Sequence, residues 1–237
     1  MNAADFRAQL ERDLSWRQNE MRILRNQINH IKTEDDKRIY CKSLLVMLYS
    51  HFEGFCKESF LSYINVINNE GANLSEVNEY IAVASLEDVF LAVCDPNKHC
   101  DFFNIYEPNN YKKFFRYVHL VSRFDQLFEL QVSIPDSLIN AEANLRPKVI
   151  ERILYRLGLP PNKFGRYEGD IHNLIERRNN IAHGIPIEGI DEELYNDFEG
   201  KIYNIMSELM IILTNSVNNK LYLKNISFND ISVSANE

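Results

Sequence analysis

Glycine and proline are scarce in this sequence, with eight and seven residues among 237. Because tight turns depend on both residues, this scarcity argues against a loop-rich all-β fold and favours long helices. The chain also lacks the 18 or more consecutive apolar residues of a membrane span, and its richest candidate, residues 209–217, is about half that length. The N-terminus carries charge throughout, unlike a signal peptide. We therefore expect a cytoplasmic protein without a membrane segment.

Cysteine is also sparse, at positions 41, 56, 94 and 100. Cys41 and Cys56 lie on one predicted helix, roughly 22 Å apart, which is too far for a disulfide. Cys94, His99 and Cys100 are close in the sequence and suggest zinc, but a structural zinc site needs four ligands and no second Cys/His pair is evident. We expect reduced thiols and no metal or cofactor. Metal binding by the 94–100 cluster is the alternative.

The formal net charge of −8 argues against nucleic-acid binding by the whole surface. Residues 146–178 are the exception, with eight Arg and Lys against four Asp and Glu. Arg152 and Arg156 are four residues apart and share one helix face. Together with Arg177, they are the predicted substrate-binding residues. A solvated helix face is the alternative interpretation.

Apolar residues recur at helical spacing over most of the chain. Pro147 suits a helix start, and Gly158 and Gly184 suit helix ends. The aromatic residues of a predicted helical insertion at 71–145 indicate a packed satellite bundle rather than a platform for stacking bases. The sequence therefore predicts one all-α domain over residues 1–237, with a tail at 219–237 that adds an edge strand or lies extended. The predicted helices cover residues 3–31, 36–68, 75–94, 109–130, 146–158, 168–183 and 191–217.

The sequence of residues 176–186 is "ERRNNIAHGIP", which places Arg178 and His183 five positions apart at a helix end. The same spacing occurs at Arg25 and His30, so the pattern alone is weak. Context separates the two. The 178–183 pair ends a helix, is followed by Gly-x-Pro and lies in the basic segment, whereas the 25–30 pair has no glycine or proline beside its histidine.

The stretch "RNNIAHG" resembles the signature of the HEPN superfamily (higher eukaryotes and prokaryotes nucleotide-binding), an Arg and a His separated by four to six residues at the end of a helix. "LYSHFEGFCKESFLSYIN" resembles the second-helix block of a bacterial subgroup of stand-alone HEPN toxin and anti-phage ribonucleases. "NLRPKVIERILYRLGL" and "LIERRNNIAHG" resemble its third and fourth helices. These blocks cover about half the chain, and the 71–145 insertion matches none of them.

The resemblance implies an antiparallel helical bundle that forms a homodimer and brings Arg and His of both subunits into one cleft. It also implies a metal-independent endoribonuclease with RNA as substrate, in a toxin–antitoxin or anti-phage system with an antitoxin or defence partner. Some relatives have lost catalysis and serve as RNA-binding or protein-interaction modules, which is the alternative function. A subset of the toxins carries a modified tyrosine two positions after the histidine. Here that position is Ile185, so this mode of neutralisation is not expected.

The resemblance assigns catalysis to Arg178, Asn179 and His183, and more weakly to Glu53. Imidazole titrates near physiological pH and suits acid–base catalysis, while a guanidinium binds phosphate oxygens in bidentate fashion. An ion pair between Glu53 and Lys57 is the alternative role of that carboxylate. Because residues five apart on a helix point about 140° apart, one subunit alone would not aim the 178–183 pair at a single atom. A two-fold axis would solve this.

Overall fold

The computed structural model describes residues 2–95, 97–104, 107, 110–139, 144–186 and 189–224. Within these ranges the fold is all-α, as predicted: the chain forms α-helices joined by short 3-10 turns, and its only β-pairings are two isolated bridges. The α-helices are α1 (Ala3–Asn26), α2 (Glu34–Asn68), α3 (Glu79–Ser85), α4 (Glu87–Cys94), α5 (Lys112–Ser122), α6 (Phe124–Phe128), α7 (Pro147–Arg156), α8 (Glu168–Ala182) and α9 (Glu192–Asn218). The 3-10 turns are η1 (Gln27–His30), η2 (Asp101–Phe103), η3 (Asp136–Ile139) and η4 (Pro161–Tyr167).

The three long helices begin at side-chain caps. Asn2 caps α1, Thr33 caps α2 and Asp191 caps α9, and each side-chain oxygen accepts the backbone N–H three residues on. Such caps satisfy amides that have no partner inside the helix. Acidic residues also lie in the first turn of all three helices, where the helix dipole favours them.

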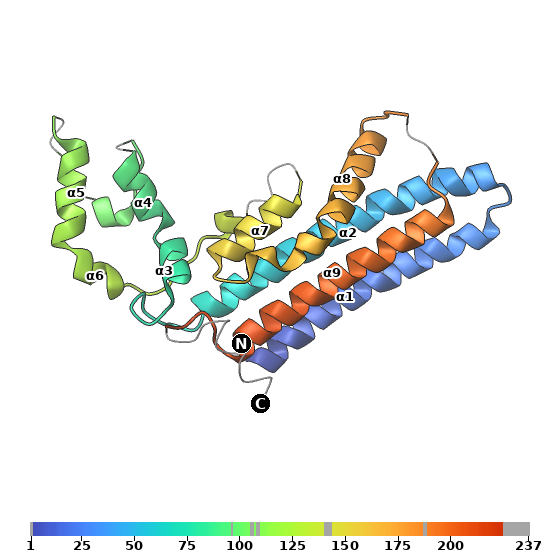
Figure 1. The fold of residues 1–237 in the computed structure, drawn as a ribbon. Coiled ribbons are helices and arrows are strands. Elements are labelled where there is room, and N and C mark those ends of the chain that lie inside the picture. Colours follow the sequence, from blue (N-terminus) through green and yellow to red (C-terminus); the bar gives the residue numbers. More distant parts are fainter. Residues whose placement is uncertain are drawn as a thin grey trace.

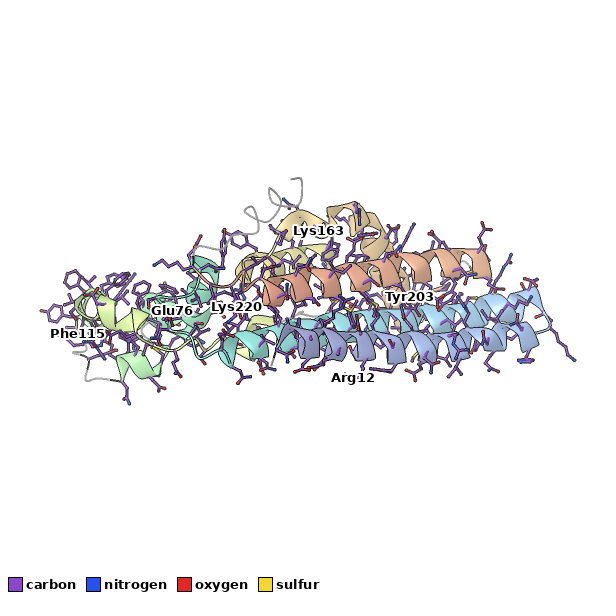
Figure 2. All side chains as sticks on the ribbon, turned by 90° about the horizontal axis from the view of Figure 1, so that it is seen from below. Arg12, Glu76, Phe115, Lys163, Tyr203 and Lys220 are labelled. Atoms are coloured by element: carbon purple, nitrogen blue, oxygen red, sulfur yellow. The ribbon has the colours of Figure 1, made fainter. Side chains whose placement is uncertain are left out.

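These helices form an antiparallel bundle in which α1 and α8 run one way and α2 and α9 the other (Figure 1). Helix α2, at 35 residues, spans roughly 52 Å. It packs against α1, α8 and α9 and is buried on most sides. Figure 2 shows α1, α2 and α9 running side by side along the molecule, with the segment around Phe115 at one end. The bundle is therefore built around α2, which carries Tyr49 and Glu53 of the candidate site below.

In the second match to the motif spacing, Arg25 and His30, the arginine has a structural role. Arg25 Nη1 donates to Glu199 Oε2 at 2.5 Å, which ties α1 to α9. Glu199 is buried and also accepts from the hydroxyl of Tyr195 at 3.0 Å. His30 lies in η1, the 3-10 turn that ends the first predicted helix. Arg25 is thus held by a carboxylate within its own subunit.

The insertion forms a lobe beyond the end of α2 (Figure 1). Each of its two predicted helices is broken, so the predictions of single helices over 75–94 and 109–130 were wrong. The first breaks at Leu86, which buries its side chain between α3 and α4, and the second at Arg123, between α5 and α6. Neither break has a glycine or proline, so the cause is tertiary packing.

The lobe joins the rest of the chain through α3, which packs on α7, and through the chain after α9. Leu223 forms an isolated bridge with Val77, and Tyr222 O accepts from Asn78 N–H at 2.9 Å. The predicted edge strand is thus a single bridge in the described part of the tail, and residues 225–237 lie outside the described residues. Among the helices described, none has the length and apolarity needed to cross a membrane.

Candidate active site at the end of α8

The end of α8 is a Schellman motif, a backbone arrangement that stops a helix with a left-handed residue. Gly184 takes φ +67, its N–H donates to Ile181 O at 3.1 Å, and the Ile185 N–H donates to Asn180 O at 2.9 Å. His183 is the residue just before this turn, and its own N–H donates to Asn179 O at 2.9 Å. The glycine therefore sets where the helix ends and leaves the His183 side chain exposed to solvent.

Arg178 lies over an aromatic ring from α2. Its guanidinium carbon is 4.7 Å from the centre of the Tyr49 ring, a cation–π contact. Its Nη1 donates to Asn179 Oδ1 at 2.9 Å and to Asn144 Oδ1 at 3.4 Å. Among the described residues, no carboxylate forms an ion pair with Arg178. Its positive charge is positioned by a ring and two amide oxygens, and no carboxylate in the described part of the subunit neutralises it.

The Tyr49 hydroxyl connects this ring to the chain before α7. It accepts from the Leu145 N–H at 3.1 Å and donates to Asn144 Oδ1 at 3.4 Å. Burial, with a smaller contribution from the nearby Glu53 carboxylate, raises the pKa of Tyr49 to about 12. The phenol is therefore neutral at physiological pH. Tyr49 and Asn144 join α2, α8 and the segment before α7, and sequence reasoning missed both.

Glu53 lies one turn beyond Tyr49 on α2 and forms an ion pair with Lys57 at 2.7 Å. This is the pair weighed above as the alternative to a catalytic role. The carboxylate also lies near the Tyr49 hydroxyl and, after burial of the ring, helps to raise the pKa of that phenol. Glu53 is thus linked to Arg178 through Tyr49.

The structure does not bring Arg178 and His183 together within one subunit. No hydrogen bond joins them among the described residues, and Arg178 turns back toward α2 while His183 lies beyond the helix end. The 140° divergence expected from the helix agrees with this arrangement. Within one subunit the two residues are therefore held in different surroundings.

The basic segment is partly neutralised. Arg156 pairs with Glu87 of α4 at 3.2 Å, and Arg166 pairs with Glu208 of α9. Arg156 ends α7, roughly 15 Å along the helix from its start beside Asn144, so it lies apart from Arg178. Arg152 is exposed on α7, and Arg177 is partly exposed on α8. Of the three predicted substrate-binding residues, Arg177 alone is a sequence neighbour of the candidate catalytic residues.

A second basic surface lies at the starts of α7 and α8. An open hollow of about 550 Å³ is lined by Arg146, Pro147, Lys148, Glu168, Gly169 and His172. Arg146 and Lys148 are exposed and follow directly on Asn144 and Leu145, the residues that contact Tyr49. Close to Asn144 in the sequence, Arg146 and Lys148 therefore supply positive charge that forms no ion pair with another residue the structure describes.

In the described part of the chain, no group of three or more His, Cys, Asp or Glu side chains could hold a metal ion. Cys94 is exposed and Cys100 is partly buried, and both are free thiols. Cys41 and Cys56 are buried free thiols on α2. Burial raises the pKa of the Cys41 and Cys56 thiols, which keeps both protonated at neutral pH.

The all-α bundle of the described residues is consistent with a HEPN fold. The chain belongs to the HEPN_MAE_28990-like HEPN family, whose model matches residues 6–222. HEPN proteins are generally associated with ribonuclease or toxin activity, and they typically dimerise and bind RNA. Neither curated proteins nor solved structures gave a match to this chain.

Proposed function

We propose that this protein is a metal-independent endoribonuclease whose active site forms between two copies of the chain. The observation that carries the proposal is the environment of Arg178: Tyr49, Asn144 and Asn179 position its guanidinium, and none of the described carboxylates pairs with it. A fixed cation of this kind is suited to a phosphate. His183 is solvent-exposed at the end of the same helix and available for proton transfer.

In the proposed reaction, one His183 accepts the proton of a ribose 2′-hydroxyl, and the 2′-oxygen attacks the adjacent phosphorus. The bond from phosphorus to the 5′-oxygen breaks, and the same His183, now protonated, returns the proton to that oxygen. The products are a 2′,3′-cyclic phosphate and a 5′-hydroxyl. Arg178 stabilises the negative charge that develops on the phosphate oxygens. Asn179 holds Arg178, and Glu53 acts through Tyr49 as a positioning residue.

An isologous dimer about a two-fold axis near the end of α8 presents the same patch twice, so it can bring Arg178 and His183 from different copies to one phosphate. Arg178 of one copy then faces His183 of the other. Arg177, Arg146 and Lys148 extend this cleft as contacts for the RNA backbone. Arg156 and Arg152 lie farther along α7, and any RNA contact there would be outside the cleft.

Cleavage of a structured RNA in EDTA tests the chemistry. We expect wild type to cut the RNA and leave cyclic phosphate ends. The variants His183→Ala and Arg178→Ala should cut at least 100-fold more slowly, which is about the rate gain that general acid–base catalysis provides. His30→Ala is the matched control, because it removes the histidine of the second match to the motif. Light scattering would establish that each variant retains the oligomeric state of wild type. Equal cutting by wild type and His183→Ala would overturn the assignment.

Mixing two inactive variants tests the shared site. When Arg178→Ala and His183→Ala subunits are unfolded and refolded together, a mixed dimer retains one wild-type pair across the two-fold axis. We expect the mixture to regain about a quarter of wild-type activity, since half the dimers are mixed and each has one working site. No recovery in the mixture would place the whole site within one subunit.

We further propose that the cutting serves as a toxin or anti-phage effector, with an antitoxin or defence protein as partner. Expression in cells tests this, with growth arrest expected for wild type and normal growth for His183→Ala. The second candidate function is a non-catalytic RNA-binding or protein-interaction module, which the net charge of −8 favours. In that case both proteins would bind RNA equally and neither would cut it.

A further inference from the structure

The lobe carries an apolar stripe that no part of the described chain covers. At least half of the surface of five of its six residues is exposed, and the sixth, Tyr117, is also exposed. The expectation that the aromatic residues of the insertion pack inside a satellite bundle is therefore wrong for this face. The stripe consists of Tyr111, Phe114, Tyr117, Val118, Val121 and Phe124.

The stripe follows one face of a single helix. Phe114, Tyr117, Val118 and Val121 are spaced three, one and three residues apart, so they fall within an arc of about 100° on α5. The opposite face holds α5 to the lobe: Arg116 is buried and donates to Ala92 O. Because α5 is already anchored from behind, the stripe is not needed for its packing. Contiguous exposed apolar surface of this kind marks an interaction site.

Charge is distributed along the stripe in a self-complementary way. Lys112 and Lys113 begin α5, whereas Asp125 and Glu129 lie beyond its other end. Lys113, Asp125 and Glu129 form no ion pair with another described residue. An antiparallel pairing of two α5 helices sets the basic end of each against the acidic end of the other.

We propose that the α5 stripe packs against the α5 stripe of a second copy about a two-fold axis near Val118. RNA fits this surface less well, because Val118 and Val121 offer no ring for stacking and the acidic end repels phosphate. Six residues are far fewer than the roughly 20–30 per side of a standard interface. The contact is therefore weak alone and acts as a second interface, beyond the cleft proposed at α8.

A symmetric cysteine tests the axis. In a Cys94→Ser/Cys100→Ser background, which removes the accessible native thiols, Val118→Cys is expected to form a disulfide-linked dimer under mild oxidation. Val121→Cys is the matched control on the same stripe. Three residues from the axis, its two copies lie about 9 Å apart along the helices, beyond the reach of a disulfide. Absence of the Val118→Cys dimer, or equal linking of both variants, would overturn the proposal.

Sedimentation at increasing protein concentration tests the contact in the native chain. Val121→Asp is expected to weaken self-association at least tenfold, whereas Ser122→Asp, an exposed neighbour outside the apolar stripe, leaves it unchanged. If Val121→Asp instead lowers RNA binding and leaves association intact, the stripe is an RNA surface and the proposal fails. The experiment is independent of catalysis, because neither variant lies near Arg178 or His183 in the sequence.

Discussion

Tyr49 is the residue on which the position of Arg178 depends. Tyr49→Phe keeps the ring beneath the guanidinium but leaves the Leu145 N–H without its acceptor. We expect it to lower the free energy of unfolding by about 1–3 kcal/mol, the cost of an unpaired buried group, with modest loss of cleavage. Tyr49→Leu removes the ring as well, and we expect a further loss of at least tenfold in cleavage rate. Denaturant melts beside cleavage assays separate the two effects.

His51 should make stability depend on pH. It is buried on α2 with Nε2 3.1 Å from Glu20 Oε2, and burial lowers its pKa below 6.5 in spite of that carboxylate. Below pH of about 6.5 the unfolded chain therefore binds more protons at this residue than the folded chain, so stability falls as the pH falls toward the folded pKa. Above that range His51 is neutral in both states and has no effect.

The variant His51→Gln should lose this component of the acid destabilisation. Unfolding free energies measured between about pH 5 and pH 8 would show a shallower dependence for it than for wild type. His30→Gln, which changes an exposed histidine, serves as the control and should follow the wild-type curve. Parallel curves for all three proteins would show that His51 has the same pKa in both states.

At the scale of elements, the end of α8 depends on Gly184. Its φ of +67 costs a residue with a side chain about 1 kcal/mol, so Gly184→Ala should destabilise by that amount. Gly169 lies in the first turn of the same helix, where an added Cβ would meet no atom within 4 Å. Gly169→Ala should therefore stabilise the protein by up to about 1 kcal/mol.

Thermal melts of the two glycine variants measure this difference. Because the Gly184 turn ends the helix beside His183, we also expect Gly184→Ala to lose more activity than its stability change explains. Full activity in a Gly184→Ala protein would mean that His183 does not need this turn.

Some of these elements could be predicted from the sequence, and others could not. The spacing of apolar residues, Pro147 and Gly158 indicated most of the bundle helices, because local caps and one-sided burial decide them. The breaks at Leu86 and Arg123 carry no local signal. Nor could the contact of Tyr49 with Asn144 be predicted, since 95 residues separate them and the contact depends on how α2 meets the start of α7.

At the scale of the molecule, the lobe and the bundle should unfold separately. Buried Arg116 ties the lobe together, since it pairs with Glu107 at 2.6 Å and donates to Ala92 O and Lys98 O. Arg116→Ala leaves these partners unsatisfied, and we expect amides of α4 and α5 to exchange with deuterium at least tenfold faster. Protection of α2 and α9 should change little. Equal loss of protection in the lobe and the bundle would show one cooperative unit.

The charge of Arg178 also affects the choice of buffer for the protein. A guanidinium that pairs with no carboxylate over the described ranges is open to any small oxyanion in the medium. Phosphate or sulfate in a purification or assay buffer would then compete with RNA for the same position. Under such conditions an active preparation would look inert, and exchange into a chloride buffer would restore it.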